Sequence, residues 1–374
     1  MNPALDARAT VPFNALERQH DAALRADLTD TIERVVKSGW YVLGEEVAAF
    51  EREFAAYCGV GHAIGVANGS DALELAIASL DLPHGSEVAL APNAAMYATL
   101  AVLATGCVPR FVDVDADSCN LDPEAVQHAI AAGSRAVIVT HLYGRMASIE
   151  AIVAHAASRG IPVIEDCAQA HGAARGGRRA GSFGRLGCFS FYPTKNLGAL
   201  GDGGAIVTDD ATLAQRLRQL RQYGWATKYD VAIAHGRNSR LDELQAAMLR
   251  RKLVRLDEWN RRRRAIARRY HDGIVHPDIR VPAIVADGDV AHLYVVRSSE
   301  RDALRRHLTE RGIRTDVHYP IPDHRQAIFH GRFDAMHLPV SEALARSVLS
   351  LPCFPELRDD EVDAVIDACN EWRR

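Results

Sequence analysis

A lysine with unusual neighbours is the first residue in this sequence whose setting suggests chemistry. Lys195 lies in the stretch SFYPTKNLGALGDGG (190–204), between an aromatic segment broken by proline and a segment dense in glycine. The residues before it, GRLGCFSFYP, and after it, GGAIVTDD, are each typical of a β-strand. A surface lysine needs no such frame, so we expect Lys195 to be held in a site where its amine acts as a nucleophile or a base.

Two further segments could complete such a site. NGSDA (68–72) joins a short strand to a helix, and the small residues Gly69 and Ser70 at a helix N-terminus favour an anion. The same segment could equally be an ordinary capped helix start. Asp166 ends the apolar strand in IPVIEDCAQ (161–169), at the end where ligands bind in open α/β sheets. A carboxylate there needs a partner, and a plain capping role is its alternative.

The anion site at 69–70, the acid Asp166 and the lysine Lys195 together match the needs of pyridoxal 5'-phosphate. That cofactor requires a phosphate cup, an acid that keeps its pyridine nitrogen protonated and a lysine that forms an imine. The protonated ring is an electron sink, and the freed lysine can move a proton between carbon atoms. We expect partial burial and cationic surroundings to lower the pKa of Lys195.

Other kinds of site find little support in the sequence. It contains no G-x-x-x-x-G-K-[ST], H-E-x-x-H or G-x-S-x-G motif, and GALGDGG (198–204) opens no βα crossover. A nicotinamide or nucleoside-triphosphate enzyme is therefore disfavoured, and no metal site is expected. The net charge of -4 argues against a nucleic-acid surface, and the basic run at 261–264 fits a solvated helix face.

Alternating elements must position these residues. Helical patterns such as 47–59, which should end at Gly59, alternate with runs rich in Val and Ile. The expected strands are 62–68, 87–93, 108–115, 136–144 and 161–169. This order predicts an α/β fold with a mostly parallel sheet covered on both faces.

The pattern of expected elements changes near Leu241. A long helical pattern follows without Pro or Gly until Gly273, and it could link a large domain to a smaller one. We expect a large cofactor-binding α/β domain with the N-terminal segment over 1–245, and the linking helix with a small α+β domain over 246–374. In the small domain, the expected strands are 292–298 and 313–320, and the expected helices are 303–312 and 359–372.

Composition points to a globular protein of the cytoplasm. The chain has 374 residues, of which 48% are hydrophobic and 25% charged. Its seven cysteines are scattered without a C-x-x-C pair, which indicates a reducing compartment. The first 14 residues have no apolar signal region, and no apolar run approaches the roughly 18 to 20 residues of a membrane span.

The motifs, taken together and in order, resemble the DegT-type (also DnrJ/StrS) sugar aminotransferases, which are pyridoxal-phosphate enzymes of fold type I, like aspartate aminotransferase. The resemblance runs from about Val11 to Trp372. It is carried by SGWYVLGEEVAAFEREFA, NGSDALELAI, VIEDCAQAHGA, SFYPTKNLGALGDGGAIVT, GRNSRLDELQAAML and HYPIPDH.

This resemblance implies roles for the residues at matching positions. Lys195 would be the Schiff-base lysine, Asp166 would pair with the pyridine nitrogen, and Gln169 would contact the hydroxyl side of the ring. The phosphate would be bound by Gly69, Ser70 and Ser190. Asn238, in the G-x-N-x-R motif, would reach the phosphate of the neighbouring subunit, so that a homodimer would share its active sites.

One position departs from the family. Relatives usually place an aromatic residue over the cofactor ring, in a segment that matches APNAAMYAT (91–99). An ungapped reading puts Met96 there, and its thioether could pack on the ring. A local shift would bring in Tyr97 instead, and Tyr97 could equally be part of the core.

The resemblance also suggests a substrate. Lys195 favours transamination, because the sugar dehydratases of the family carry histidine at that position. GRNSRLDELQAAML, HLYVVR and YPIPDH look most like enzymes that aminate C3 of dTDP-linked 3-keto-6-deoxyhexoses, with L-glutamate as the usual donor. A dTDP- or UDP-4-keto sugar, a dehydratase and a non-catalytic regulator are the alternatives.

Residues that could face the sugar nucleotide are Tyr192, His318, Tyr319 and His324. For the three residues of HYPIPDH (318–324), packing within the small domain is the alternative interpretation.

Overall fold

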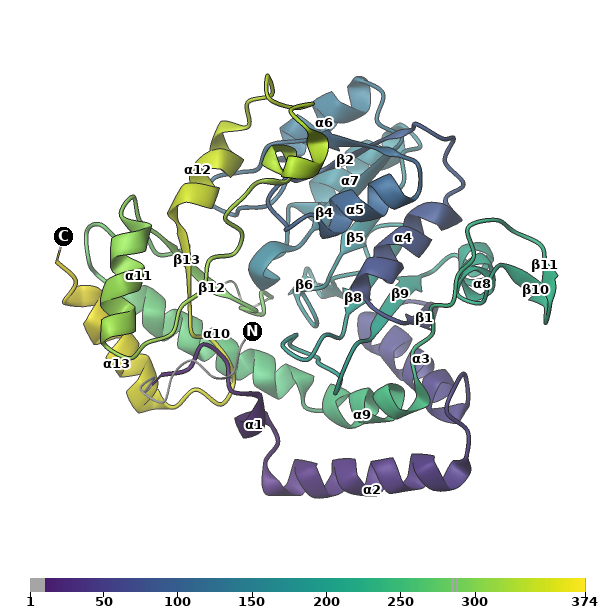
Figure 1. Cartoon of the computed structure of the whole chain (residues 1–374), viewed down its shortest axis with the longest axis horizontal. Helices are drawn as coiled ribbons and strands as arrows, with labels where there is room; N and C mark the ends of the chain where they lie inside the picture. The colour runs from purple at the N-terminus through teal and green to yellow at the C-terminus, as the bar shows by residue number, and fades with distance from the viewer. Residues whose placement is uncertain (1–10, 284–285, 287, 374) are drawn as a thin grey trace.

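A seven-stranded sheet forms the centre of the molecule (Figure 1). The computed structural model describes residues 11–283, 286 and 288–373. The strand order is β1-β9-β8-β5-β4-β2-β3, and β9 runs antiparallel to both β1 and β8, whereas the other pairings are parallel. The strands are β1 (His62–Val66), β2 (Glu87–Leu90), β3 (Val108–Phe111), β4 (Ala136–Thr140), β5 (Val163–Asp166), β8 (Leu186–Ser190) and β9 (Gly204–Thr208). The predicted mostly parallel α/β sheet is confirmed.

Helices cover both faces of this sheet, as the apolar strands require. Along β4, Val137 and Val139 pack in one buried cluster with α3, α6 and α7, while Ile138 packs in another with α4, α5 and α8. This division follows from the alternation of side chains along a strand. The helices are α3 (Glu45–Cys58), α4 (Gly69–Ser79), α5 (Tyr97–Ala104), α6 (Pro123–Ala131), α7 (Ile149–Ser158) and α8 (Ala211–Leu220).

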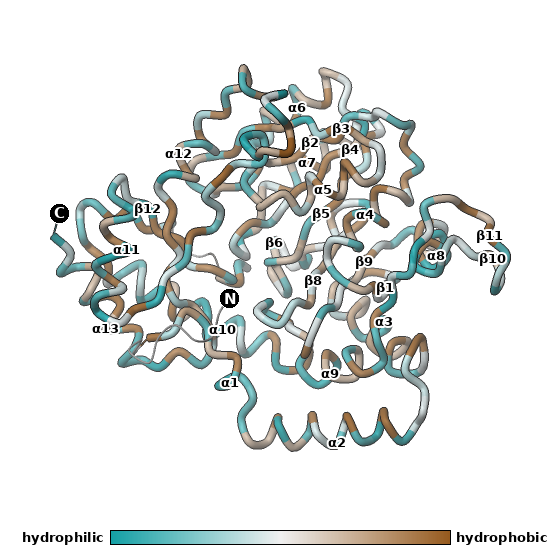
Figure 2. Tube along the Cα trace, in the orientation of Figure 1, coloured by the Kyte–Doolittle hydropathy of each residue, from teal (hydrophilic) through white to brown (hydrophobic). Residues whose placement is uncertain are grey.

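Hydrophobic residues are concentrated on the central strands, as the brown stretches around β2 and β4 show (Figure 2). Within the described residues, no helix is both long enough and apolar enough to cross a membrane.

The predicted long helix after Leu241 is two helices. It is broken between α9 (Glu243–Leu253) and α10 (Leu256–Gly273), with no Pro or Gly at the break. Leu253 and Leu256, on either side of the break, both pack in the cluster of α3, and farther along α10 Tyr270 packs in a third cluster.

This third cluster is built mainly from C-terminal elements. It gathers Tyr294, Phe354 and Trp372, and it also takes in Val11 and Ala15 from the other end of the described chain. Its elements are β12 (Tyr294–Arg297), α11 (Arg301–Glu310), β13 (Val348–Leu351) and α13 (Asp359–Asn370). The domain boundary expected at 245/246 stays a prediction.

The strand expected over 313–320 is not formed, and this prediction was wrong. The partner of β12 is β13, in an antiparallel pair that joins Tyr294 to Leu351. The expected segment makes only isolated bridges, from Ile313 to Val11 and from Asp316 to Ser350. Pro320 and Pro322, which lack a backbone donor, follow these bridges, and the chain turns toward the large sheet.

The remaining elements lie around this body. Helix α2 runs along one side beside α9, and the hairpin of β10 and β11 projects from the molecule beyond α8 (Figure 1). They are α1 (Leu16–Gln19), α2 (Ala22–Ser38), β6 (Ala174–Arg175), β7 (Arg178–Arg179), β10 (Trp225–Thr227), β11 (Asp230–Val231) and α12 (Pro339–Ser347), with 3-10 turns at Leu142–Gly144, Asp323–Arg325 and Ala327–Phe329.

Candidate active site

A cavity of about 440 Å³ lies where β5 and β8 end. It brings together most of the residues predicted for the cofactor. Its lining consists of Asn68, Gly69, Ser70, Leu73, Tyr97, Asp166, Ala168, Ser190, Tyr192, Lys195 and Asp202. The carboxyl edge of the sheet is the position that an open α/β fold predicts for a ligand site.

Lys195 lies in a tight loop that follows β8. Its backbone N–H donates to Tyr192 O at 2.8 Å, and farther along the loop the buried Lys252 of α9 donates to Gly198 O at 2.9 Å. A Cβ on Gly198 would stand 2.3 Å from Pro193 O, so this close turn requires glycine. Burial lowers the pKa of the Lys195 amine to about 8, although the carboxylate of Asp166 opposes the shift.

Asp166 is the last residue of β5 and is buried. Its carboxylate accepts hydrogen bonds from Ala168 N at 3.1 Å and from Thr140 Oγ1 at 3.4 Å. Burial raises the pKa of this carboxyl, while these hydrogen bonds and Lys195 oppose the shift. The group therefore gains from a cationic partner in the cavity.

The N-terminus of α4 forms another wall of the cavity. Asn68 caps this helix, because its Oδ1 accepts the N–H of Asp71 at 2.8 Å. Sequence reasoning missed Asn68 as a lining residue, although its type before a glycine was a cap signal. A Cβ on Gly69 would lie 2.6 Å from Cβ of Ser190, so glycine leaves room between this helix end and β8.

The structure separates Met96 from Tyr97. Met96 is 8% exposed and packs in the cluster of α4 and α5, whereas Tyr97 is 53% exposed and lines the cavity. The turn before α5 is held by Asp323, whose carboxylate accepts Met96 N at 2.9 Å and Thr99 Oγ1 at 2.6 Å. The position of Tyr97 over a cofactor ring stays a prediction. The sequence did not reveal Asp323 as the residue that holds this turn.

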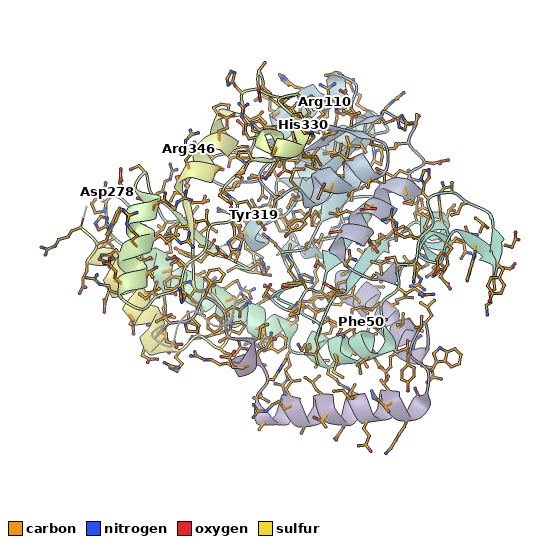
Figure 3. All side chains as sticks on the ribbon, in the orientation of Figure 1. Phe50, Arg110, Asp278, Tyr319, His330 and Arg346 are labelled. Carbon is orange, nitrogen blue, oxygen red and sulfur yellow. The ribbon has the colours of Figure 1, made fainter. Side chains whose placement is uncertain are left out.

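Gln169 and Tyr319 meet beside the cavity without lining it. Gln169 Nε2 donates to Tyr319 Oη at 2.8 Å, and Gln169 Oε1 accepts the N–H of Tyr143 at 2.6 Å. Figure 3 shows Tyr319 near the middle of the molecule. These bonds connect the 313–320 segment to the loop after β5.

The two histidines of HYPIPDH (318–324) pack against neighbouring side chains. His318 Nδ1 lies 2.9 Å from Ser350 Oγ. The buried His324 Nε2 lies 3.1 Å from Glu342 Oε1. Among the four residues expected on the substrate side, only Tyr192 lines the cavity.

Asn238 is exposed and does not line the cavity of its own chain. It forms an isolated bridge with Gln222, at the base of the projecting hairpin of β10 and β11. Its predicted contact with phosphate therefore requires a second copy of the chain.

Glu165, the neighbour of Asp166, has a structural role. Its Oε1 accepts the N–H groups of Phe183 and Gly184, and its Oε2 accepts that of Gly181 and lies 2.9 Å from His141 Nε2. The other ring nitrogen of this histidine accepts a backbone N–H at 3.1 Å, so Nε2 carries the proton. Glu165 and His141 lie close to Cys167, in a group of side chains that could bind a metal ion. However, the carboxylate oxygens and ring nitrogens are already engaged in hydrogen bonds within the protein.

The pattern of the DegT/DnrJ/EryC1/StrS aminotransferase family matches residues 22–370. The chain belongs to this family. It is 47% identical over 365 residues to the dTDP-3-amino-3,4,6-trideoxy-alpha-D-glucose transaminase of Streptomyces venezuelae, covering 97% of this chain and 96% of that protein. It is 46% identical over 363 residues to the dTDP-3-amino-3,6-dideoxy-alpha-D-galactopyranose transaminase of Aneurinibacillus thermoaerophilus, covering 97% and 99%.

Solved structures share the fold of this family member. Streptomyces venezuelae DesV, in complex with a ketimine intermediate, matches with a TM-score of 0.92 and 46% identity, over 97% of this chain and 98% of that one. The Bacillus subtilis protein NtdA, with bound cofactor PMP, matches with a TM-score of 0.90 and 28% identity, over 96% and 84%. The fold predicted from the sequence, that of type I pyridoxal-phosphate enzymes, is confirmed.

We expect Gly69→Ala to weaken binding of pyridoxal phosphate, because the new methyl group would be forced against Ser190 where the phosphate should lie. Gly61→Ala is the matched control, since its Cβ would meet no atom closer than 3.7 Å. Titration of both apo-proteins with the cofactor, followed by absorbance, measures the difference. Equal affinities in the two variants would contradict a phosphate site at α4.

Proposed function

We propose that this protein transfers an amino group from L-glutamate to C3 of a dTDP-linked 3-keto-6-deoxyhexose, with pyridoxal 5'-phosphate as cofactor. The observation that carries the proposal is one cavity that joins Lys195, Asp166 and the N-terminus of α4. It lies in a chain that is 46% to 47% identical, over 97% of its length, to two transaminases named for dTDP-3-amino sugars.

The lining of the cavity fits the cofactor. Backbone amides at Gly69 and Ser70 begin α4, where the helix dipole favours a phosphate, and the Ser190 side chain stands opposite. Asp166 offers a buried carboxylate to the protonated pyridine nitrogen. Tyr97 lines the cavity and would cover the ring, and Gln169, whose Nε2 donates to Tyr319 Oη, would meet the hydroxyl side of the ring.

Lys195 supplies the nucleophile and the mobile proton. A pKa of about 8 leaves a substantial fraction of its Nζ neutral in mildly alkaline solution, so the amine can attack a carbonyl carbon. The same Nζ can accept a proton from the α-carbon of the donor and return it to the carbon that receives nitrogen. The cofactor, when bound, supplies the electron sink that makes these protons acidic.

Asp166 keeps that electron sink effective. A carboxylate withdrawn from water interacts more strongly with a cation than an exposed one does. Its bonds with Ala168 N and Thr140 Oγ1 fix the orientation of the carboxylate. The carboxylate would therefore keep a proton on the ring nitrogen of the bound cofactor.

A homodimer with shared active sites completes the proposal. Asn238 is exposed on its own chain, and large apolar side chains are exposed nearby on the projecting hairpin, including Tyr229 and Val231. Such a surface is suited to contact with another subunit. The seven free cysteines agree with a place in the reducing cytoplasm.

We expect Lys195→Ala to fold normally but to lose both the absorption band of lysine-bound cofactor and turnover, because the nucleophilic amine is gone. Lys195→Arg, which keeps a cation but cannot form the covalent link, should be equally inactive. Circular dichroism checks the fold, and absorbance with a coupled glutamate assay checks the chemistry. Turnover at the wild-type rate in either variant would rule out the assigned role.

Product analysis tests the substrate directly. Incubation with L-glutamate and either 3-keto or 4-keto sugars, each linked to dTDP or UDP, should yield an amino sugar most rapidly from the dTDP-linked 3-keto compound. Mass spectrometry identifies the product, and 2-oxoglutarate release gives the rate. Faster amination of a 4-keto sugar would favour the alternative substrate class, and loss of water without amination would indicate a dehydratase.

Mixed dimers test the shared site. Asn238→Ala and Lys195→Ala are each expected to be inactive alone, because each leaves both sites of its homodimer incomplete. Co-expressed in equal amounts, they should recover about one quarter of wild-type activity, since half of the dimers are mixed and each contains one intact site. No recovery, with heterodimers demonstrated by two affinity tags, would argue against a contribution from Asn238 across the interface.

A further inference from the structure

A buried polar contact lies directly beside the lysine that the proposed function requires. Asn196, the next residue in the chain, is 1% exposed. Its Nδ2 lies 2.8 Å from Asn260 Oδ1 and 3.2 Å from Val290 O, and its Oδ1 lies 2.8 Å from His292 Nδ1. All polar atoms of this side chain are therefore engaged within the protein.

These contacts fix the donors and acceptors without ambiguity. The nitrogen of Asn196 faces two oxygens, so it donates to both and its Oδ1 is left as an acceptor. His292 must then carry its proton on Nδ1. Burial holds the pKa of His292 well below its usual range, and the nearby cations Lys195 and Arg263 lower it further. The imidazole is neutral and acts here as a hydrogen-bond donor.

His292 is itself held in place. Its backbone carbonyl accepts a hydrogen bond from the buried Arg263 of α10 at 3.1 Å. It lies two residues before β12, and Asn260, the other partner of Asn196, also belongs to α10. The residue next to the lysine is thus bound at once to α10 and to the segment that leads into β12.

The other side chains that anchor the loop act farther from the lysine. Lys252 binds Gly198 O, and Gln245 Oε1 accepts the N–H of Leu200 at 2.8 Å, so α9 holds the residues that follow Asn196. Neither contact fixes the backbone at Lys195, from which the side chain with the amine extends.

We propose that Asn196 and His292 are a pair of positioning residues that set the direction of the Lys195 side chain toward the cavity. The inference rests on the proposed function, since it assigns to Lys195 the covalent link with the cofactor. Displacement of a reacting group by about 1 Å can lower a rate by roughly 100-fold, so a fixed neighbour has a direct effect on catalysis.

Two substitutions of the histidine test the hydrogen bond. His292→Leu removes the donor and leaves Asn196 Oδ1 unpaired, whereas His292→Asn places an amide N–H at the position of Nδ1. We expect His292→Leu to lower, by roughly 10- to 100-fold, both the rate at which apo-protein attaches pyridoxal phosphate and kcat with glutamate. The KM for glutamate should change much less. His292→Asn should restore both rates to within a few-fold of wild type.

Further variants separate positioning from stability. His276→Leu is the control, because His276 bonds Trp372 O and Asp278 N outside the cavity, so its loss should lower Tm without slowing attachment. Asn196→Ala should slow attachment as His292→Leu does, and the double variant should be no slower than the slower single one. If His292→Leu does not fold, Asn196→Ala carries the test.

The outcomes distinguish this inference from the function on which it rests. Attachment at the wild-type rate in His292→Leu or Asn196→Ala overturns the positioning pair. Equal slowing in His292→Asn and His292→Leu does so as well, because the restored donor would then have no effect. A wild-type protein that attaches no cofactor, or transfers no amine from glutamate, overturns the proposed function instead.

Discussion

The withdrawal of two opposite charges from water at one edge of the sheet is the constraint on which the site depends. Burial raises the pKa of the Asp166 carboxyl and lowers that of the Lys195 amine, and each group opposes the shift of the other. Charges in such a place are stable only when partners are fixed around them. Because β5 and β8 are parallel neighbours, their carboxyl ends place both residues at the same cavity without a long excursion of either loop.

The alternation of side chains along β5 explains why two adjacent acids have different roles. Glu165 and Asp166 must point to opposite faces of the sheet. Glu165 accepts the backbone N–H groups of Gly181, Phe183 and Gly184 and lies against His141, so its charge is satisfied by the protein. Asp166 receives fewer hydrogen bonds and faces the cavity, which leaves its charge available to a ligand. One residue of register thus separates a structural acid from the candidate catalytic one.

Local patterns were sufficient for the sheet and for most of the cavity. Strands and helices around it could be predicted because apolar periodicity, Gly59 as a left-handed cap and the strand-end position of Asp166 are all encoded within a few residues. The failures have distant causes. The break in the helix after Leu253 carries no local signal, and the segment 313–320 forms only isolated bridges, whereas β12 pairs with the distant β13. Likewise, Met96 turns inward with φ of 66° because Asp323, 227 residues away, binds its N–H.

The C-terminal half of the chain has a supporting role in the site. The cavity is lined by residues between Asn68 and Asp202, but the side chains that hold its loops come largely from residues 245–323. Loop closure over such separations adds little entropy cost per extra residue, because the cost grows only with the logarithm of length. Reactive groups can therefore lie on short loops, free to meet a ligand, while rigid helices such as α9 and α10 fix their positions. We therefore expect substitutions far from the cavity in sequence, at Lys252, Asn260 or Asp323, to affect the chemistry through the loops that these side chains hold.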